Sequence, residues 1–201
     1  MIRLANIDDI PAIAKLHYQE LEWTINGRLG LLHIQKIYEN LWQEDDFFVV
    51  VYESSEDGNL AGFIAATTNS TAARERIRKV LDFRKSIRII GSAFLHPGDI
   101  PHLLENIFLI PRDIRQLNMS AEILSWVVET NTPAGAKAGF FSFFECLKEM
   151  DRRGFSSCFA QVLKRNQKPN LFYRKMGSQV ARNDISNCLY VISCASTKTT
   201  G

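Results

Sequence analysis

Two strand-like runs separated by a helix constrain the fold of this chain more than any other feature. Residues 122–128 (EILSWVV) and 156–163 are mostly apolar and of strand length. Between them, residues 140–153 carry apolar side chains at helical spacing, and Gly154 follows, where a helix end favours glycine. Strands joined through a helix pair in parallel, with a crossover connection. The sequence therefore predicts an α/β fold.

Residues 47–52 (FFVVVY) and 60–66 predict a β-hairpin in the first half of the chain. They flank a polar turn that contains Asp57-Gly58, a typical hairpin signal. A hairpin is antiparallel, so the whole sheet is predicted to be mixed, with helices on both faces. The remaining predictions are a strand at 2–5, helices at 10–21, 31–42 and 169–175, and strands at 178–181 and 188–193.

Residues 69–118 form an insertion of different character between the third and fourth predicted strands. Residues 70–90 hold seven basic side chains against two acidic ones, and their apolar residues recur at helical spacing. We predict a basic amphipathic helix here and another from Ile100 to about Phe108. The basic face has three alternatives: a solvated surface, a clamp for an acidic acceptor or for phosphates, or a membrane-surface contact.

Composition excludes several classes of protein. The chain has 201 residues, a 46% hydrophobic share and a net charge of +2, which fits a single globular domain over residues 1–201 and disfavours a dedicated nucleic-acid binder. No apolar run approaches a membrane span, and no signal peptide opens the sequence. The four cysteines show no metal-ligand spacing, so we expect reduced thiols, no metal and a cytoplasmic protein.

Residues 130–139 (TNTPAGAKAG) form a small-residue segment between a predicted strand and a helix. Main-chain N–H groups at a helix start can hold a pyrophosphate, and small side chains let the backbone approach it. Alternatively, the segment is a tight turn that binds nothing. The expected ligand-binding positions are Gly135, Ala136, Lys137, Ala138 and Gly139.

A more specific pattern lies at residues 166–177 (NQKPNLFYRKMG). It resembles the C-terminal motif N-x-x-A-x-x-F-Y-x-K-x-G-F of the GNAT superfamily of acyl-CoA-dependent N-acyltransferases. The match covers Asn166, Phe172, Tyr173, Lys175 and Gly177, with departures at positions 169 and 178. The first strand and helix and the hairpin also resemble this family. The resemblance implies a GNAT-like, strongly twisted mixed sheet with a helical insertion.

The same resemblance implies acetyl transfer from acetyl-CoA to a primary amine. Tyr173 matches the family's general-acid tyrosine, and Asn166 lies at the cofactor motif. The splayed fourth strand would offer main-chain N–H groups near Val127 and Val128. The family's phosphate motif [QR]-x-x-G-x-[GA] falls on residues 134–139, where Lys137 replaces the central glycine and can supply a positive charge instead.

The acceptor amine must lose a proton before it attacks, because alkylamines titrate near pH 10. Glu122 is the preferred base, since it begins the fourth strand, where family members often carry an acid. Glu129 and Glu53 are alternatives, and each of the three can instead be an exposed strand-end carboxylate.

The expected partners are acyl-CoA and an amine acceptor, without nucleic acid. Two alternatives stay open: a non-catalytic acyl-CoA-binding or regulatory module on the same fold, and a surface-binding protein that acts through residues 70–90. The acceptor, the acyl chain and the oligomeric state, a homodimer included, cannot be read from the sequence.

Overall fold

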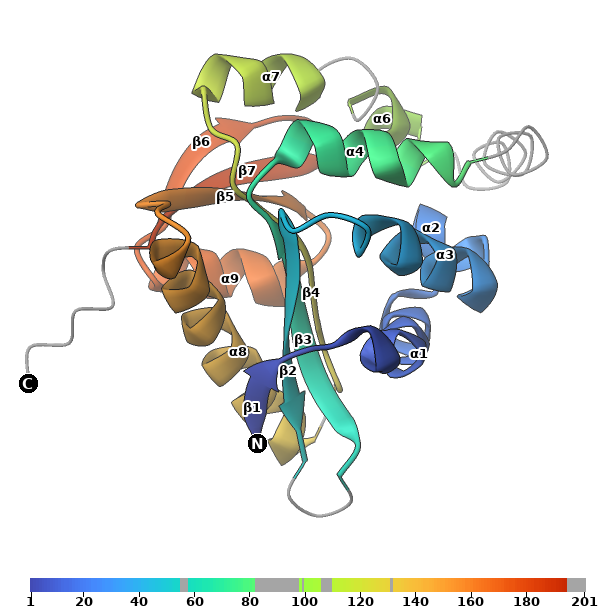
Figure 1. The fold of residues 1–201 in the computed structure, drawn as a ribbon. Helices are drawn as coiled ribbons and strands as arrows, with labels where there is room; N and C mark the ends of the chain where they lie inside the picture. Colours follow the sequence, from blue (N-terminus) through green and yellow to red (C-terminus); the bar gives the residue numbers. More distant parts are fainter. Residues whose placement is uncertain (55–57, 82–97, 99, 106–109, 131, 195–201) are drawn as a thin grey trace, which may run out of the picture.

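The structure is a computed structural model that describes residues 1–54, 58–81, 98, 100–105, 110–130 and 132–194. Its strands form one seven-stranded sheet in the order β1-β2-β3-β4-β5-β7-β6 (Figure 1). Neighbouring strands are antiparallel, except that β4 and β5 are parallel. The predicted mixed sheet is therefore confirmed. The strands are β1 (Ile2–Leu4), β2 (Phe47–Glu53), β3 (Leu60–Thr67), β4 (Glu122–Val128), β5 (Ser157–Leu163), β6 (Gln179–Asn183) and β7 (Asn187–Ser193).

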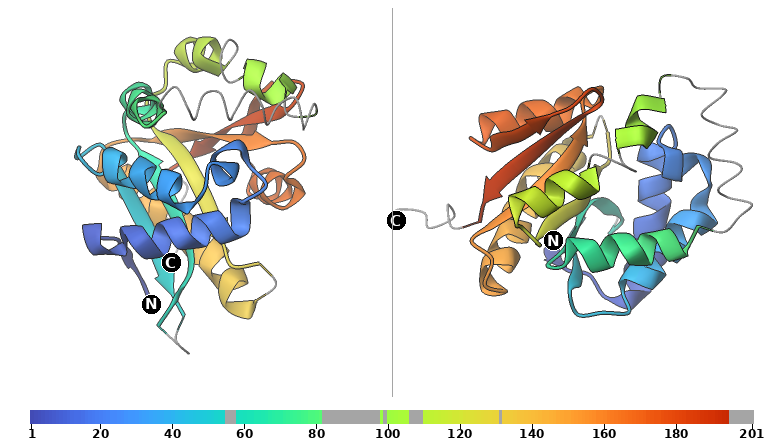
Figure 2. Two further views of the ribbon diagram at one scale, coloured as in Figure 1. Left: turned by 90° about the vertical axis from the view of Figure 1, so that its right-hand side faces the viewer. Right: turned by 90° about the horizontal axis from the view of Figure 1, so that it is seen from above.

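Helices cover both faces of the sheet. On one face lie α1 (Ile10–Leu21), α2 (Ile25–Arg28) and α3 (Leu31–Leu41), which stand in front of the strands in the left view of Figure 2. The other face is covered by α8 (Pro133–Arg152), and α9 (Gln167–Lys175) packs into the same core. The short helix α2 was not predicted from the sequence.

Strand β2 shows why a continuous apolar run was needed. Side chains alternate between the two faces of a strand. Phe47, Val49 and Val51 pack with α1 and α3 in one core, whereas Phe48 and Val50 pack with α8 in the other. Since both faces are covered, every position from 47 to 51 is buried.

The segment predicted as a loop up to Gly139 is helical from Pro133 onward, so that prediction was wrong. Thr132 has extended backbone, and its hydroxyl accepts a hydrogen bond from the Gly135 N–H at 2.9 Å. Proline follows as the first helical residue, where its fixed φ favours a helix. The helix therefore begins seven residues earlier than its apolar spacing indicated.

The insertion between β3 and β4 contains α4 (Ser70–Lys79), α6 (Ile100–Leu104) and α7 (Ile110–Leu117), of which α7 was not predicted. Helix α4 is the described part of the predicted basic helix; residues 82–97 and 106–109 lie outside the described residues. Arg74 pairs with Glu122, and Arg76 pairs with Asp46. Two of the basic side chains therefore bind carboxylates of the fold and do not form a free basic surface.

Candidate active site

The parallel strands β4 and β5 are in register at only two positions, Glu122 with Phe159 and Ile123 with Ala160. Beyond Ile123 the two strands separate, while β4 stays paired with β3 to its end. Figure 1 shows β4 running away from β5. One edge of β4 therefore lacks a strand partner in the middle of the sheet.

The pairing of β4 with β3 decides which main-chain groups reach this open edge. Glu129 donates its N–H to the carbonyl of Ala61 at 2.9 Å, one position beyond the Gly62–Val128 pair. Main-chain groups of an antiparallel strand turn to alternate sides. Val128 and Trp126 therefore turn toward the gap, whereas Val127 turns toward β3. Of the two predicted donors, only Val128 faces the gap, and Trp126 takes the place of Val127.

A cavity of about 410 Å³ lies between β4 and β5 on the side of the sheet covered by α1 and α3. We call it the β4–β5 cavity. Its walls combine apolar and polar side chains and come from α1, α2, α3 and α4 as well as from the two strands. Both predicted catalytic residues line it, and so does Asn166. The structure thus brings Glu122, Tyr173 and Asn166 together, although they are far apart in the sequence.

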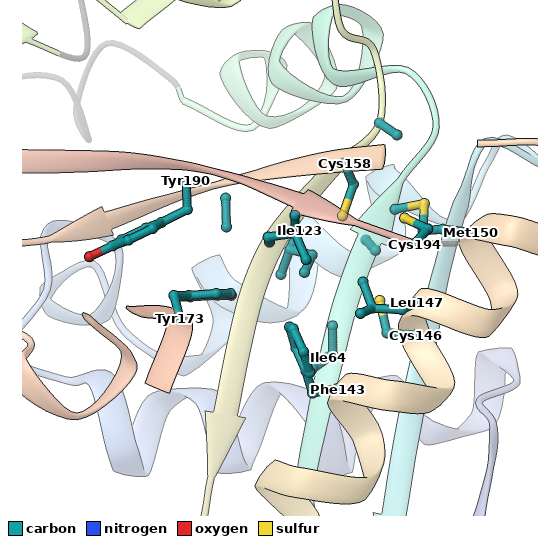
Figure 3. Packing of buried hydrophobic residues seen from close by; sticks show 14 of the residues in the cluster. Ile64, Ile123, Phe143, Cys146, Leu147, Met150, Cys158, Tyr173, Tyr190 and Cys194 are labelled. Atoms are coloured by element: carbon teal, nitrogen blue, oxygen red, sulfur yellow. The ribbon is translucent and has the colours of Figure 1, made fainter. Parts of the chain in front are cut away.

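Tyr173 lies on α9 with 2% of its surface exposed. Its ring stacks on Tyr190 at a centroid distance of 5.1 Å and meets Trp126 edge to face at 5.6 Å; Figure 3 shows it below Tyr190. Burial raises the pKa of Tyr173 well above its usual value. The phenol is therefore neutral at pH 7 and can donate a hydrogen bond, whereas the raised pKa disfavours complete transfer of its proton to a thiolate.

Asn170, which sequence reasoning missed, holds this tyrosine pair in place. Its side-chain amide donates to the carbonyls of Leu163 at 2.8 Å and Asn166 at 2.6 Å, and its oxygen accepts from the Tyr190 hydroxyl at 2.9 Å. Asn170 lies within the motif at 166–177. A polar asparagine inside this short predicted helix was the one sequence feature that could have pointed to it. The asparagine links the end of β5 to the ring that supports Tyr173.

Glu122 is buried, so an exposed strand-end carboxylate is excluded for this residue. The hydroxyl of Ser70 donates to it at 2.5 Å, and Arg74 binds both of its oxygens. Both partners lie on α4. The insertion therefore supplies the groups that neutralise the carboxylate at the point where β4 and β5 separate.

The two alternative acids lie elsewhere. Glu53 binds the Arg3 guanidinium at 2.6 Å, and Glu129 accepts a hydrogen bond from the Thr132 hydroxyl at 3.1 Å. Neither lines the β4–β5 cavity. Among the three candidate bases, Glu122 alone reaches it.

His17 and Tyr38 form a polar pair in the apolar wall of the cavity, and sequence analysis gave no reason to connect them. The His17 Nδ1 lies 2.7 Å from the Tyr38 hydroxyl. Burial lowers the pKa of His17 to about 4 and raises that of Tyr38. Both side chains are therefore uncharged at neutral pH, and the pair can donate or accept hydrogen bonds without adding charge.

The start of α8 offers few free main-chain donors. Pro133 has no N–H, Gly135 donates to the Thr132 side chain, and Ala136 donates to the Thr132 carbonyl. Within the first turn, Ala134 is left without a partner among the described residues. Lys137 is exposed beside it. A phosphate would therefore find one free N–H and one ammonium here.

The small residues of α8 serve helix–sheet packing. A Cβ at Gly135 would lie 1.8 Å from the Glu129 carbonyl oxygen, and a Cβ on Gly62 of β3 would lie 2.7 Å from the Cβ of Ala138. Ala138 and Gly139 are buried against the sheet, whereas Ala136 and Lys137 face outward. Of the five predicted ligand-binding positions, two are at the surface and three pack inward.

Two further absences concern only the residues that the structure describes. No three histidine, cysteine, aspartate or glutamate side chains converge as a metal site would require. No described helix is long and apolar enough to cross a membrane. All four cysteines are buried free thiols.

Comparison with known proteins finds similarity in structure but not in sequence. No protein-family model matches the chain, and no curated protein matches its sequence. Three solved structures illustrate the similarity. The PaiA N-acetyltransferase from Thermoplasma acidophilum, in complex with coenzyme A, has a TM-score of 0.52 and 17% identity, covering 96% of this chain and 99% of its own.

An N-acetyltransferase from Staphylococcus aureus Mu50 has a TM-score of 0.58 and 13% identity, covering 96% of this chain and 98% of its own. A putative acetyltransferase of the GNAT family from Desulfovibrio desulfuricans has a TM-score of 0.58 and 10% identity. The match covers 96% of this chain and 99% of that chain. The similarity spans nearly all of both chains. The chain therefore has the fold of the GNAT superfamily of N-acetyltransferases.

Proposed function

We propose that this protein is an acyltransferase that moves an acyl group, most simply acetyl, from acyl-CoA to a primary amine. The observation that carries the proposal is the separation of β4 from β5 beside the β4–β5 cavity, with Tyr173 at the boundary. The gap gives two reactants access to one point from opposite faces of the sheet.

Donor binding would use both the open strand edge and the start of α8. The N–H groups of Val128 and Trp126 suit the amide groups of the CoA arm, while the Ala134 N–H and Lys137 suit its phosphates. The indole Nε1 of Trp126 is also buried without a partner among the described residues, so this edge has a further donor to satisfy. Acyl-CoA supplies the activated thioester.

Proton movements are assigned to two residues. Tyr173 is neutral and would donate a hydrogen bond to the leaving sulfur, which strengthens as negative charge develops there. Glu122 stays the candidate base for the amine, since its carboxylate lines the cavity. Arg74 and Ser70 already occupy its oxygens, so an amine proton would have to displace one of these bonds or pass through water.

The test is a thiol-release assay with acetyl-CoA and a panel of amines. Tyr173→Phe removes one hydroxyl and is expected to lower kcat by roughly 10²–10⁴-fold, while acetyl-CoA still raises the Tm. Tyr18→Phe, on α1 and outside the cavity, is the matched control and should not change kcat. Normal turnover by Tyr173→Phe would leave this tyrosine as a packing residue.

A second candidate function has its own support. The carboxylate of Glu122 is already bound by Ser70 and Arg74, so the candidate base is occupied, which suits a protein that binds acyl-CoA without turning it over. Saturable acetyl-CoA binding with no thiol release from any amine would favour this regulatory module over the enzyme.

A further inference from the structure

We propose that the β4–β5 cavity takes an acceptor with a single amine, an apolar body and an acidic group, and that it discriminates against polyamines. The proposal rests on the proposed function, because the cavity is there assigned to the acceptor. It follows from three properties of the cavity: its size, its lining and its charges.

The size and lining suit a small apolar body. A volume of about 410 Å³ is within the range of small-molecule sites. The wall contributed by α1, α2 and α3 is formed largely by aliphatic side chains: Leu21, Ile25, Ile34, Ile37 and Leu41. Burying apolar surface of a ligand against this wall stabilises a complex.

The charges disfavour a second ammonium group. Among the described residues, Glu122 is the sole acidic side chain of the lining, and Arg74 and Ser70 already bind its carboxylate. His17 adds no charge at neutral pH, because burial lowers its pKa to about 4. A second ammonium would therefore enter an apolar site without a free counter-ion, which is costly.

A cation at the rim favours an acidic group instead. Arg78 lies on α4, one helical turn after Arg74, and also lines the cavity. It is exposed and has no carboxylate partner among the described residues. With the Arg74–Glu122 pair neutral and His17 uncharged, Arg78 gives the described lining of the cavity a net positive charge. An anion on the acceptor would complement it, and binding would depend on salt.

The reaction balances for such an acceptor. The amine nitrogen forms an amide bond to the acyl carbon as the carbon–sulfur bond of the thioester breaks. The nitrogen loses one proton as the ammonium becomes the free amine and a second as the amide forms; the sulfur takes up one proton, and the other is released to solvent. The acidic group takes no part and serves only recognition.

The experiment uses three amines of nearly equal shape: para-(aminomethyl)benzoate, benzylamine and para-xylylenediamine. They place a carboxylate, a hydrogen or a second ammonium at the same position. Binding to the full chain is measured by calorimetry at low salt, and turnover with acetyl-CoA is measured separately. We expect the carboxylate to bind roughly tenfold more tightly than benzylamine, and the diamine most weakly.

Two charge reversals test the assignment of Arg78. Arg78→Glu should weaken the carboxylate by about tenfold and strengthen the diamine. Lys79→Glu makes the same change of charge one residue later, at a side chain outside the cavity lining. It should leave all three affinities within about twofold.

The outcomes separate this proposal from the proposed function. Preferential turnover or binding of the diamine, or equal effects of Arg78→Glu and Lys79→Glu, would overturn the proposal while leaving acyl transfer intact. Arg78-dependent binding of the carboxylate with no turnover would support the cavity assignment and count against the enzyme. Failure of all three amines to bind, with a preference for octanoyl-CoA over acetyl-CoA, would instead assign the cavity to the acyl chain.

Discussion

The two sides of the gap between β4 and β5 are built in opposite ways. On the α8 side, capping by Thr132 and close contact at Gly135 use up most of the polar groups of the helix start. On the α1–α3 side, a cavity remains, with polar groups from α1, α3, α4 and β4. The structure of the α8 side is fixed by residues close together in the sequence, whereas the cavity is formed by contacts between distant segments. Variants on the two sides should therefore differ in how they change stability, activity and acyl-CoA binding.

The largest effect is expected at Gly135. Gly135→Val places a side chain against the Glu129 carbonyl, where a Cβ would lie at 1.8 Å, so α8 must move away from β4. We expect a loss of about 3 to 4 kcal/mol and a Tm lower by roughly 10 °C, measured by thermal unfolding. Gly139→Ala is the control, because its Cβ would meet Val128 at an ordinary 3.4 Å. An unchanged Tm for Gly135→Val would contradict the packing account.

The buried ion pair of the cavity should come next. Glu122→Gln leaves the Arg74 guanidinium without its carboxylate and should cost about 3 kcal/mol, measured by denaturant unfolding. Ser70→Ala removes only one hydrogen bond and should cost about 1 kcal/mol.

A double variant separates stability from catalysis. Combining Glu122→Gln with Arg74→Met removes both charges and should recover much of the lost stability. If Glu122 is the base, activity stays low in the double variant. Recovery of activity together with stability would show that Glu122 only supports the cavity.

A pH-dependent effect is expected from His17. Its pKa is about 4 in the folded protein against about 6.5 in the unfolded chain, so the unfolded state binds the proton first as pH falls. The stabilisation is full above pH 6.5 and is lost as pH falls toward 4, by about 3 kcal/mol. His17→Gln should flatten the stability curve in this window. If the stability of His17→Gln fell equally steeply between pH 6.5 and 4, the loss of stability in acid would be due to other groups.

The smallest effect is expected at Lys137. Removing one exposed ammonium by Lys137→Ala should weaken acyl-CoA binding by roughly five- to tenfold at low salt, and less as salt rises. Lys148→Ala, further along α8, is the control. Tighter binding by Lys137→Gly than by the parent would show that the lysine obstructs the phosphates.

Local patterns predicted much of the secondary structure. The run at 122–128 gave the bounds of β4 without error, and the alternation-free run at 47–52 gave a strand buried on both faces. The start of α8 was placed too late, because its first turn has small residues and no apolar stripe; the signal overlooked was Thr132 before Pro133. These features depend on residues a few positions apart.

The sequence by itself determined the order of the strands and of most helices, the burial pattern of β2 and the motif around Tyr173, because each is encoded by neighbouring residues. Only the tertiary structure decided that Arg74 neutralises Glu122, that His17 meets Tyr38, and that Trp126 rather than Val127 faces the gap. Those contacts join residues up to about 48 positions apart, or depend on which edge of a strand stays unpaired. Such contacts between distant residues are selected by the packing of the whole sheet, and no local periodicity in the sequence predicts them.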